Sequence, residues 1–369
     1  MPEISAVVVG SGIAGASTAF ALARRGVSVT VVDDGQFGQA TAASAGIIQP
    51  WSSSAEGDYY AAYSAGAAFY PELLERLAEL GITRTDYRRS GALVVNADEA
   101  LLEATYRRVQ ERAATAGSVV GTVERIGNAE ARALFPALAE GVDAVHISGG
   151  GRVDGRTLRD ALLAGAEKLG AVRRRGAVSL VPHDGRVESR VDGDVLTADA
   201  VIVAAGAWSD GILSAVGATV PVAPQRGQIT HLRLEGVDTS MWPSVHPISH
   251  HYVVAFDDSR IAVGATRETG SGFDPRVTAA GQLQVLQDAL HVVPGLADAT
   301  LIETRVGLRP LPDDQLPLVG AVPGVEGAYV ATGYGAGGLT MGPLFGDALA
   351  RSIVGEAAPE LEHTPVQLS

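Results

Sequence analysis

A glycine-rich turn near the N-terminus lies between a short apolar segment and a helical one. The apolar segment, residues 6–9, predicts a strand, and the sequence GSGIAG follows at residues 10–15. A helical pattern then leads to a second apolar segment, residues 28–32, which is followed by Asp33. Strand, glycine turn, helix, strand and acid follow one another at the spacing of a dinucleotide-binding β–α–β unit. The chain is therefore expected to fold around a dinucleotide site at its first crossover.

Each glycine of this turn has a separate physical role. Gly10 permits the tight turn out of the strand, and Gly12 lets the backbone approach a pyrophosphate without a Cβ in between. Gly15 lets the helix pack close to the strand. The free N–H groups and partial positive charge of the helix N-terminus favour phosphate binding. Asp33 is placed to accept hydrogen bonds from an adenosine ribose, and its charge disfavours the 2′-phosphate of NADP.

The composition limits where in the cell the protein is expected and which classes of partner it is expected to bind. Its 369 residues, 46% of them hydrophobic, suffice for two domains or one large one, and no apolar run reaches the ~18 residues of a membrane span. No basic segment precedes the first strand, so we expect no signal peptide, a cytoplasmic location and at most peripheral membrane contact. The net charge is −14 without a long basic run, so we expect no nucleic-acid partner.

The chain has no cysteine and a single lysine, Lys168. The absence of cysteine excludes disulfides, thiolate nucleophiles, iron–sulfur clusters and thiolate zinc sites. Lys168 falls in a helical segment, residues 157–169, and is expected to be a solvated surface side chain. Catalysis by a lysine amine is therefore not expected.

Helical and strand patterns alternate irregularly along the rest of the chain. The longer helices are expected at residues 58–80, 98–116, 157–169, 278–291 and 339–354. Strands are expected at residues 91–95, 172–175, 177–181, 187–191, 200–204, 222–234, 251–264, 305–310, 316–319 and 328–331. Because segments of the parallel-sheet type interleave with antiparallel ones, we expect an α/β fold of two domains, with a discontinuous cofactor domain.

Three later segments carry further cofactor signals. The loop at residues 41–51 has small side chains that permit close approach of a flat cofactor, and two hydroxyls able to reach phosphate oxygens. An apolar strand ends in Ala-Ala-Gly within residues 201–209. A glycine-rich turn at residues 332–343 leads into the last helix, whose positive end can point at a flavin ring. Taken alone, each segment is also compatible with an ordinary loop or turn.

An arginine at the end of an apolar strand is the signal for a substrate. Arg309 lies in the sequence GLRP at residues 307–310. An unpaired arginine in such a place is costly, and its fork binds a carboxylate through two hydrogen bonds. The alternative is a salt bridge to Asp313 or Asp314, which follow closely.

Together these five segments resemble the D-amino-acid oxidase superfamily, most closely its glycine oxidase, sarcosine oxidase and D-amino-acid dehydrogenase branch. The similarity covers nearly the whole chain in collinear order and includes residues 226–228 and 264–268. It implies FAD and a Rossmann-like, two-dinucleotide-type FAD-binding domain with an interleaved antiparallel-sheet substrate domain. The first is expected at residues 1–84, 140–218 and 300–369, the second at residues 85–139 and 219–299. The missing cysteine favours non-covalent FAD, and no histidine precedes His146.

Carried onto this chain, the resemblance assigns Arg309 and Tyr252 to the substrate carboxylate and Val178 to a backbone contact with the adenine. Tyr334, where many relatives have histidine, and His250 complete the candidate catalytic residues. The candidate cofactor contacts are Gly10, Gly12, Ile13, Ala14, Gly15, Asp33, Asp34, Thr41, Ala43, Ser44, Gly46, Ile47, Val178, Ala205, Gly206, Trp208, Arg309, Gly335, Ala336, Gly337, Gly338, Leu339 and Thr340.

The chain departs from these relatives at two places. Ala336 falls where glycine oxidase-like relatives carry a second arginine, which puts a glycine-tuned pocket in doubt. Residues 261–264 lack the lysine with which sarcosine oxidase-like relatives activate oxygen, which weakens the expectation of an oxidase. His246, His250 and His251 lie close together, but no cysteine or nearby carboxylate completes a zinc site, so we expect no metal. By strand alternation, one of the last two histidines could line the substrate pocket.

We therefore expect FAD-dependent oxidation of the Cα–N bond of an amino acid of the D-, glycine or N-methyl type, by hydride transfer to flavin N5. The imine would hydrolyse to a keto acid, and O2 or another electron acceptor would reoxidise the flavin. Two alternatives stay open: an FAD-dependent 2-hydroxy-acid dehydrogenase, and a flavin-bearing subunit of an electron-transfer complex.

Overall fold

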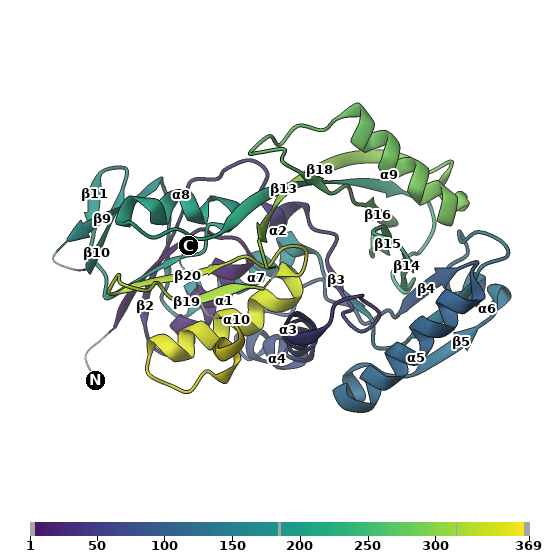
Figure 1. Cartoon of the computed structure of the whole chain (residues 1–369), viewed down its shortest axis with the longest axis horizontal. Coiled ribbons are helices and arrows are strands. Elements are labelled where there is room, and N and C mark those ends of the chain that lie inside the picture. The colour runs from purple at the N-terminus through teal and green to yellow at the C-terminus, as the bar shows by residue number, and fades with distance from the viewer. Residues whose placement is uncertain (1–3, 184–185, 315, 365–369) are drawn as a thin grey trace.

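The computed structural model describes residues 4–183, 186–314 and 316–364. Two large sheets dominate it, and a smaller three-stranded sheet lies at one end of the molecule (Figure 1). The first large sheet contains the predicted dinucleotide unit, and the second contains the strand expected to carry the substrate arginine. Helices from distant parts of the chain pack on both sheets.

A six-stranded sheet is built around the N-terminal unit, in the order β19-β20-β12-β1-β2-β8. Its strands are β1 (Ser5–Val9), β2 (Ser28–Asp33), β8 (Val172–Arg175), β12 (Ala200–Val203), β19 (Leu318–Ala321) and β20 (Ala328–Thr332). All neighbours pair in parallel except β19 and β20. Helix α1 (Ile13–Arg24) packs on this sheet and against α7 (Gly155–Lys168) and α10 (Gly338–Ile353). This arrangement confirms the predicted α/β fold class.

Close packing of α1 on β1 depends on two glycines. A Cβ on Gly15 would lie 2.0 Å from the backbone oxygen of Gly10. A Cβ on Gly10 would lie 2.5 Å from the backbone oxygen of Ala204, which follows β12. Gly10 also has a φ of +100°, a conformation that L side chains rarely adopt. These glycines therefore set the spacing between β1, β12 and α1.

Gly15→Ala is expected to displace the start of α1 and to weaken binding of the cofactor expected from the sequence, FAD, about tenfold or more, because backbone atoms occupy the space of the new Cβ. FAD content after dialysis measures the effect. Gly127→Ala is the matched control, since Gly127 has a φ of −75° and no atom within 4 Å of its Cβ position. Full FAD content in Gly15→Ala would contradict the packing argument.

A nine-stranded mixed sheet forms the other half of the molecule. Eight strands follow the order β17-β13-β16-β15-β14-β4-β6-β5, and β18 pairs with β13. These strands are β4 (Ala92–Asn96), β5 (Val123–Ile126), β6 (Asp143–Ile147), β13 (Val222–Arg233), β14 (Ser244–Pro247), β15 (Tyr252–Ala255), β16 (Arg260–Gly264), β17 (Glu268–Thr269) and β18 (Thr300–Pro312). Helix α9 (Ala279–Val292) packs on β13 and β16, and α5 (Glu99–Ala116) packs on β4, β5 and β6. Figure 1 shows these two helices on the side away from the N-terminus.

The remaining strands form a three-stranded sheet and a two-stranded one. They are β9 (Val178–His183), β10 (Arg186–Val191) and β11 (Asp194–Leu196), and the pair β3 (Ile47–Ile48) and β7 (Gly151–Arg152). The shorter helices are α2 (Ala40–Ala43), α3 (Gly57–Ala68), α4 (Tyr70–Ala78), α6 (Asn128–Leu134) and α8 (Ser209–Leu213). The single helix predicted at residues 58–80 is thus two helices. Pro71, near the start of α4, has no N–H to continue the hydrogen-bond ladder of α3.

Sheet membership differs from the predicted domain ranges at two places. β6 falls in the range 140–218 predicted for the FAD-binding domain, yet it pairs with β4 and β5 of the nine-stranded sheet. β18 falls in the predicted range 300–369, yet it pairs along its length with β13. Strand partners that lie far away in the sequence leave no local signal, so the sequence did not indicate these pairings. The two-domain division itself stays a proposal, and residues 1–3 and 365–369 of the predicted ranges lie outside the described residues.

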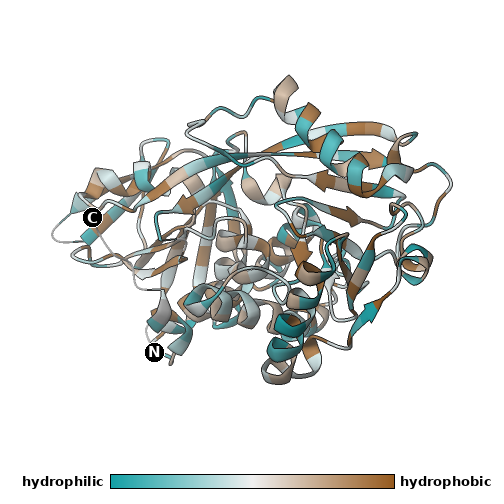
Figure 2. Cartoon of the chain, turned by 45° about the vertical axis from the view of Figure 1, so that its right-hand side comes forward, coloured by the Kyte–Doolittle hydropathy of each residue, from teal (hydrophilic) through white to brown (hydrophobic). Residues whose placement is uncertain are grey.

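Hydrophobic residues concentrate in the strands of both large sheets, whereas the outer helices also carry hydrophilic residues (Figure 2). The nine-stranded sheet and its helices bury a hydrophobic cluster of their own, which includes Leu93, Val245 and Val285. A separate cluster joins α1, α7 and α10 to the six-stranded sheet. In the described parts of the chain, no helix is both long and apolar enough to cross a membrane.

Candidate active site

A cavity of about 580 Å³ lies between the two large sheets. Its walls come from the carboxyl ends of β1 and β2, the loop after β2, the strand β18 and the start of α10. Ligands of open α/β sheets bind at this edge, outside the carboxyl ends of parallel strands. All but three of the predicted cofactor and catalytic residues line the cavity. The exceptions are Gly15, Gly337 and Thr340.

Asp33 ends β2 in the cavity wall and is tied to the glycine turn. Its Oδ2 accepts hydrogen bonds from the N–H and the hydroxyl of Ser11, both at 2.7 Å. Its Oδ1 accepts from the N–H of Gly35 at 2.7 Å. The acid thus fixes the chain on both sides of the place predicted for the ribose. Asp34 and Val178 line the cavity with it.

The N-terminus of α1 opens onto the cavity. The N-cap, Gly12, has no side chain to cap the helix, and the N–H of Ile13 donates to Thr41 Oγ1 at 2.9 Å. Thr41 was predicted to reach a phosphate, and its O–H remains a donor for that contact although its oxygen already caps the helix. Ser44 Oγ accepts the N–H of Gly46 at 3.2 Å, which leaves the serine hydroxyl proton available in the same way.

A second helix start, that of α10, forms another part of the wall. Gly335, Ala336, Gly338 and Leu339 line the cavity there, and Gly335 has a φ of +51°. Thr340 does not line it, because its hydroxyl donates to the backbone oxygen of Ile47 at 3.1 Å. Two helix N-termini, glycines without a Cβ and an acid at the end of β2 therefore surround one elongated space. These features fit FAD: the helix start of α1 would hold the pyrophosphate, the acid that ends β2 the ribose, and the start of α10 the flavin.

Arg309 lies in the cavity wall and forms no ion pair with any of the described residues. Its Nη1 donates to the backbone oxygen of Thr266 at 3.0 Å and to Gln225 Oε1 at 3.3 Å. A Cβ on Gly227 would lie 2.4 Å from Nη2, so the glycine on the neighbouring strand makes room for the guanidinium. Within the described residues no ion pair joins Arg309 to the two aspartates after β18, so the alternative prediction of a salt bridge there is wrong.

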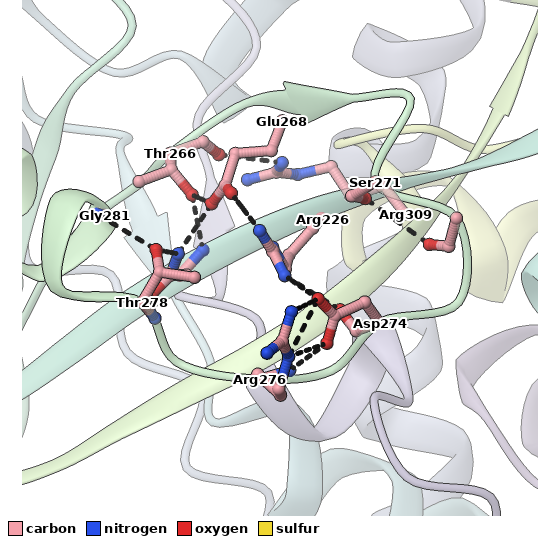
Figure 3. A network of polar contacts seen from close by, with 11 residues as sticks. Arg226, Thr266, Glu268, Ser271, Asp274, Arg276, Thr278, Gly281 and Arg309 are labelled. Atoms are coloured by element: carbon pink, nitrogen blue, oxygen red, sulfur yellow. Dashed lines mark hydrogen bonds and ion pairs between the residues drawn. The ribbon is translucent and has the colours of Figure 1, made fainter.

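A network of polar contacts holds the segment that binds Arg309 (Figure 3). Thr266 donates its hydroxyl to Glu268 Oε1 at 2.7 Å, and Arg226 pairs with Glu268 Oε2 at 2.6 Å. Arg226 also pairs with Asp274 Oδ2 at 2.7 Å. Burial raises the pKa of Glu268, but the hydrogen bonds from Arg226 and Thr266 outweigh it and hold the pKa below its ordinary value. A charged Glu268 therefore anchors the backbone that positions Arg309.

Tyr252 begins β15, and its side chain lies close enough to Arg309 for each group to affect the pKa of the other. A Cβ on Gly264 would lie 3.4 Å from the Tyr252 hydroxyl, so a larger residue there would crowd it. Burial raises the pKa of Tyr252, while the charges of Arg309 and Arg267 act in the opposite direction. Burial lowers the pKa of Arg309, but a guanidinium keeps its proton at neutral pH. The cavity therefore presents a cationic fork with a neutral phenol beside it.

The other two predicted catalytic residues are Tyr334 and His250, and their surroundings differ from those of Arg309 and Tyr252. The ring of Tyr334 packs on Phe345 of α10 with centroids 6.3 Å apart. Its hydroxyl is buried without a hydrogen-bond partner among the described residues, and burial raises its pKa well above the ordinary value. His250 is exposed in the bend before β15. We therefore assign neither residue a role in the reaction.

The three neighbouring histidines all line the cavity, whereas strand alternation predicted only one of His250 and His251. The prediction was wrong because both precede the strand, which begins at Tyr252. His251 Nε2 pairs with Asp288 Oδ2 at 2.5 Å, and burial lowers the pKa of His246 to about 4. Among the residues that the structure describes, no group of three metal-ligating side chains occurs.

Sequence reasoning missed several residues of the wall. They include Gln49, Tyr63, Ile229 and Arg267. Tyr63 lies on α3, and no local pattern in the sequence marked it as a residue of the site. Arg267 belongs to a segment that supported the family resemblance, but its position on the cavity depends on the turn that follows β16.

The segment after β2 packs directly on β18. The N–H of Leu308 donates to the backbone oxygen of Gly38 at 2.8 Å. A Cβ on Gly38 would lie 3.2 Å from the Leu308 side chain, and a Cβ on Gly307 would lie 3.0 Å from that of Ala43 in α2. The chain that leads away from Asp33 therefore contacts β18 next to Arg309.

Comparison with known proteins places this site in a family. A family model described as FAD-dependent oxidoreductase (DAO) matches residues 5–352. An uncharacterised oxidoreductase of Bacillus subtilis is 45% identical over 364 residues, 98% of this chain and 97% of that protein. A glycine oxidase of Pseudomonas putida is 31% identical over 372 residues, which cover 96% of this chain and 98% of that enzyme. The crystal structure of iminodiacetate oxidase from Chelativorans sp. is similar at 47% identity with a TM-score of 0.95, over 98% of this chain and 100% of that one. With this match over nearly its full length, the chain belongs to the DAO family of FAD-dependent oxidoreductases and is an FAD enzyme.

Proposed function

We propose that the enzyme oxidises the Cα–N bond of a small amino acid whose carboxylate is bound by Arg309. One observation carries this proposal: the guanidinium is held in the cavity wall by Thr266 and Gln225, and no acid pairs with it in the described parts of the chain. A partly buried cation of this kind is costly unless an anion completes it. A substrate carboxylate is such an anion, and the planar fork of arginine suits it.

The neighbouring residues orient the bound substrate. Tyr252 would donate its hydroxyl to one carboxylate oxygen, since the phenol stays protonated at neutral pH. With the carboxylate fixed at two points, the Cα–H bond is presented in a single orientation, which is the proximity effect that lowers a barrier. When bound, FAD supplies a two-electron acceptor for that bond. The substrate nitrogen contributes the lone pair of the new C=N bond, and water then converts the imine to a keto acid and an amine.

The relatives support an amino-acid substrate. Glycine oxidase and iminodiacetate oxidase are named for small amino carboxylates, and both match nearly this whole chain. Among the described residues that line the cavity, the carboxylates are Asp33 and Asp34, at the end assigned to the ribose, and the nearby Glu268 is paired with Arg226.

Anaerobic bleaching of the flavin tests the proposal. The purified holoenzyme is mixed without oxygen with glycine, N-methylglycine, iminodiacetate, the two alanine enantiomers, L-proline and glycolate. We expect reduction by at least one amino acid and none by glycolate. Reduction by glycolate alone would support the 2-hydroxy-acid alternative, and no reduction by any amino acid would refute the proposed function. The rate of reoxidation in air then distinguishes an oxidase from a dehydrogenase.

A further inference from the structure

The segment that follows β3 forms a polar part of the cavity wall. Gln49 and the three serines at residues 52–54 line the cavity. β3 is attached to the start of α10, because the hydroxyl of Thr340 donates to the backbone oxygen of Ile47 at 3.1 Å. The start of α10 is the part of the wall assigned to the flavin. Residues 51–55, which we call the serine segment, therefore border the space in which a substrate would meet the flavin.

Arg112 of α5 binds the serine segment without lining the cavity. Its Nη1 donates to the backbone oxygens of Trp51 at 2.9 Å and Ser53 at 2.7 Å, and its Nη2 donates to that of Ala55 at 2.5 Å. The guanidinium carbon lies 3.8 Å from the centroid of the Tyr60 ring on α3. The rigid, planar set of donors of an arginine suits such a combination of contacts. One side chain of α5 therefore fixes three carbonyl groups of the serine segment.

Arg108, one helical turn before Arg112, binds a fourth carbonyl group. Its Nη2 donates to the backbone oxygen of Ser52 at 3.1 Å. With four of its five carbonyl oxygens bound by α5, the serine segment turns its backbone oxygens toward that helix. The part of the segment that lines the cavity must then be formed by other groups, and the serine hydroxyls are polar groups among them.

The hydroxyls of Ser52 and Ser53 differ in their partners. Ser52 Oγ accepts a hydrogen bond from Gln49 Nε2 at 2.7 Å, and the N–H of Ser52 donates back to Gln49 Oε1 at 3.3 Å. The N–H of Ser53 donates to the backbone oxygen of Pro50 at 3.0 Å, but its hydroxyl is buried without a hydrogen-bond partner among the described residues. An unpaired buried hydroxyl is costly. Ser53 Oγ is therefore the group of this segment for which a bound molecule would be a partner.

On the basis of the proposed function, we infer that Arg112 is a positioning residue, which holds the serine segment so that Ser53 Oγ accepts a hydrogen bond from the substrate amine. Arg309 and Tyr252 bind the carboxylate in that function, and the amine is the remaining polar group of a small amino acid. An amine N–H donates and a hydroxyl oxygen accepts, so the two groups are complementary. Arg112 does not touch the substrate and acts through Ser53.

Arg112→Met tests this inference in the holoenzyme by anaerobic stopped-flow reduction with glycine, N-methylglycine and iminodiacetate. Methionine donates to none of the three carbonyl groups, so the segment loses its anchor. The apparent Kd of the reducing amino acid is expected to rise about 5- to 30-fold. The limiting rate of flavin reduction should change less than about threefold, because the amine contact is made both before and during the reaction. Arg112→Lys keeps a charged donor and should recover part of the loss.

A control variant and a stability measurement separate positioning from folding. Arg107→Met is the matched control, because it removes a 72% exposed arginine of the same helix that pairs with Glu103, and it should change neither value. A variant that was only less stable would lose FAD or unfold at a lower temperature, while its remaining holoenzyme kept the wild-type Kd. FAD content and the thermal midpoint are therefore measured beside the kinetics.

Ser53→Ala removes the hydroxyl and leaves the contacts of Arg112 in place. The Kd of the amino acid is expected to rise about 3- to 10-fold. If Arg112 acts through Ser53, the double variant should lose little more than Arg112→Met alone, and less than the product of the two single losses. Methoxyacetate has a carboxylate but no N–H, and it perturbs the flavin spectrum when it binds. Its Kd should change less than about twofold in Ser53→Ala.

The outcomes distinguish the inference from the proposed function. A wild-type Kd in Arg112→Met with full FAD, multiplicative losses in the double variant, or an equal loss for methoxyacetate would each overturn the inference and leave the amino-acid reaction standing. If no amino acid reduces the wild-type flavin, the proposed function fails. Titration of the oxidised flavin with N-methylglycine then decides the inference alone. Weaker binding in both Arg112→Met and Ser53→Ala would retain the contact to an amine, and unchanged or absent binding would refute it as well.

Discussion

Arg309→Met is expected to lower kcat/KM for the amino-acid substrate by about a hundred- to a thousandfold while FAD stays bound. The guanidinium is fixed by Thr266 and Gln225, and methionine keeps the length of the side chain but removes its charge and its donors. Because the carboxylate is bound both before and during the reaction, the loss should fall mainly on KM. Steady-state kinetics and the flavin spectrum of each variant measure the effect.

Two further variants test whether the loss in Arg309→Met comes from the guanidinium group at this position. Arg309→Lys retains the charge but not the planar fork, so an intermediate loss is expected. Arg186→Met removes an exposed arginine that pairs with Glu326 far from the cavity, and its kinetics should match the wild type. Wild-type KM values in Arg309→Met with a full complement of FAD would exclude the proposed carboxylate contact.

Asp347→Asn is expected to destabilise the protein by about 2–4 kcal/mol. Asp347 lies on α10 with its side chain only 6% exposed, and three arginines converge on it. They are Arg25 after α1, Arg76 on α4 and Arg351 on α10. Removing the central charge leaves three guanidinium groups crowded together, which is why the cost exceeds that of an exposed ion pair. Denaturant unfolding monitored by tryptophan fluorescence measures the difference.

The effect of Asp347 should also depend on pH. Burial raises the pKa of this carboxyl, but the hydrogen bond and charge of Arg76, and then Arg25, outweigh it and hold the pKa below its ordinary value. The contribution of Asp347 is therefore complete above about pH 4 and is lost as the pH falls through the lower pKa of the folded state. The gap between wild type and Asp347→Asn should narrow in acid. Glu326→Gln, at an exposed pair, should cost under about 0.5 kcal/mol, and an equal cost at both positions would contradict the argument.

The local parts of the fold were predictable because their signals are short-range. The glycine turn, α1 and the strand that ends at Asp33 occupy adjacent residues, and the structure places them as predicted. Sheet partners were not predictable in the same way. β18 was expected at residues 305–310 but runs from Thr300 to Pro312, because its length is set by pairing with β13 and not by its own hydrophobic pattern.

The residues of the candidate site were likewise predictable where a local sequence pattern marked them, and not where only folding brings them to the cavity. The cofactor side was read from glycines and small residues in the first glycine turn and three later segments, and all of the predicted residues except Gly15, Gly337 and Thr340 line one cavity. Arg309 was identified because a strand-end arginine is costly without an anion. Tyr334 lines the cavity as predicted, with its ring packed on Phe345 of α10, and Arg267 was missed because only the folded turn after β16 brings it to the cavity.

The contact between the segment after β2 and the strand β18 also restricts how this enzyme can evolve. Gly38 accepts the hydrogen bond of Leu308, and Gly307 leaves space for α2, so a side chain added on either segment meets the other. Substitutions at Gly38 and Gly307 should therefore be epistatic, each tolerated only in certain backgrounds of the other. A lineage that changes its substrate by reshaping the strand near Arg309 must then keep this crossing intact.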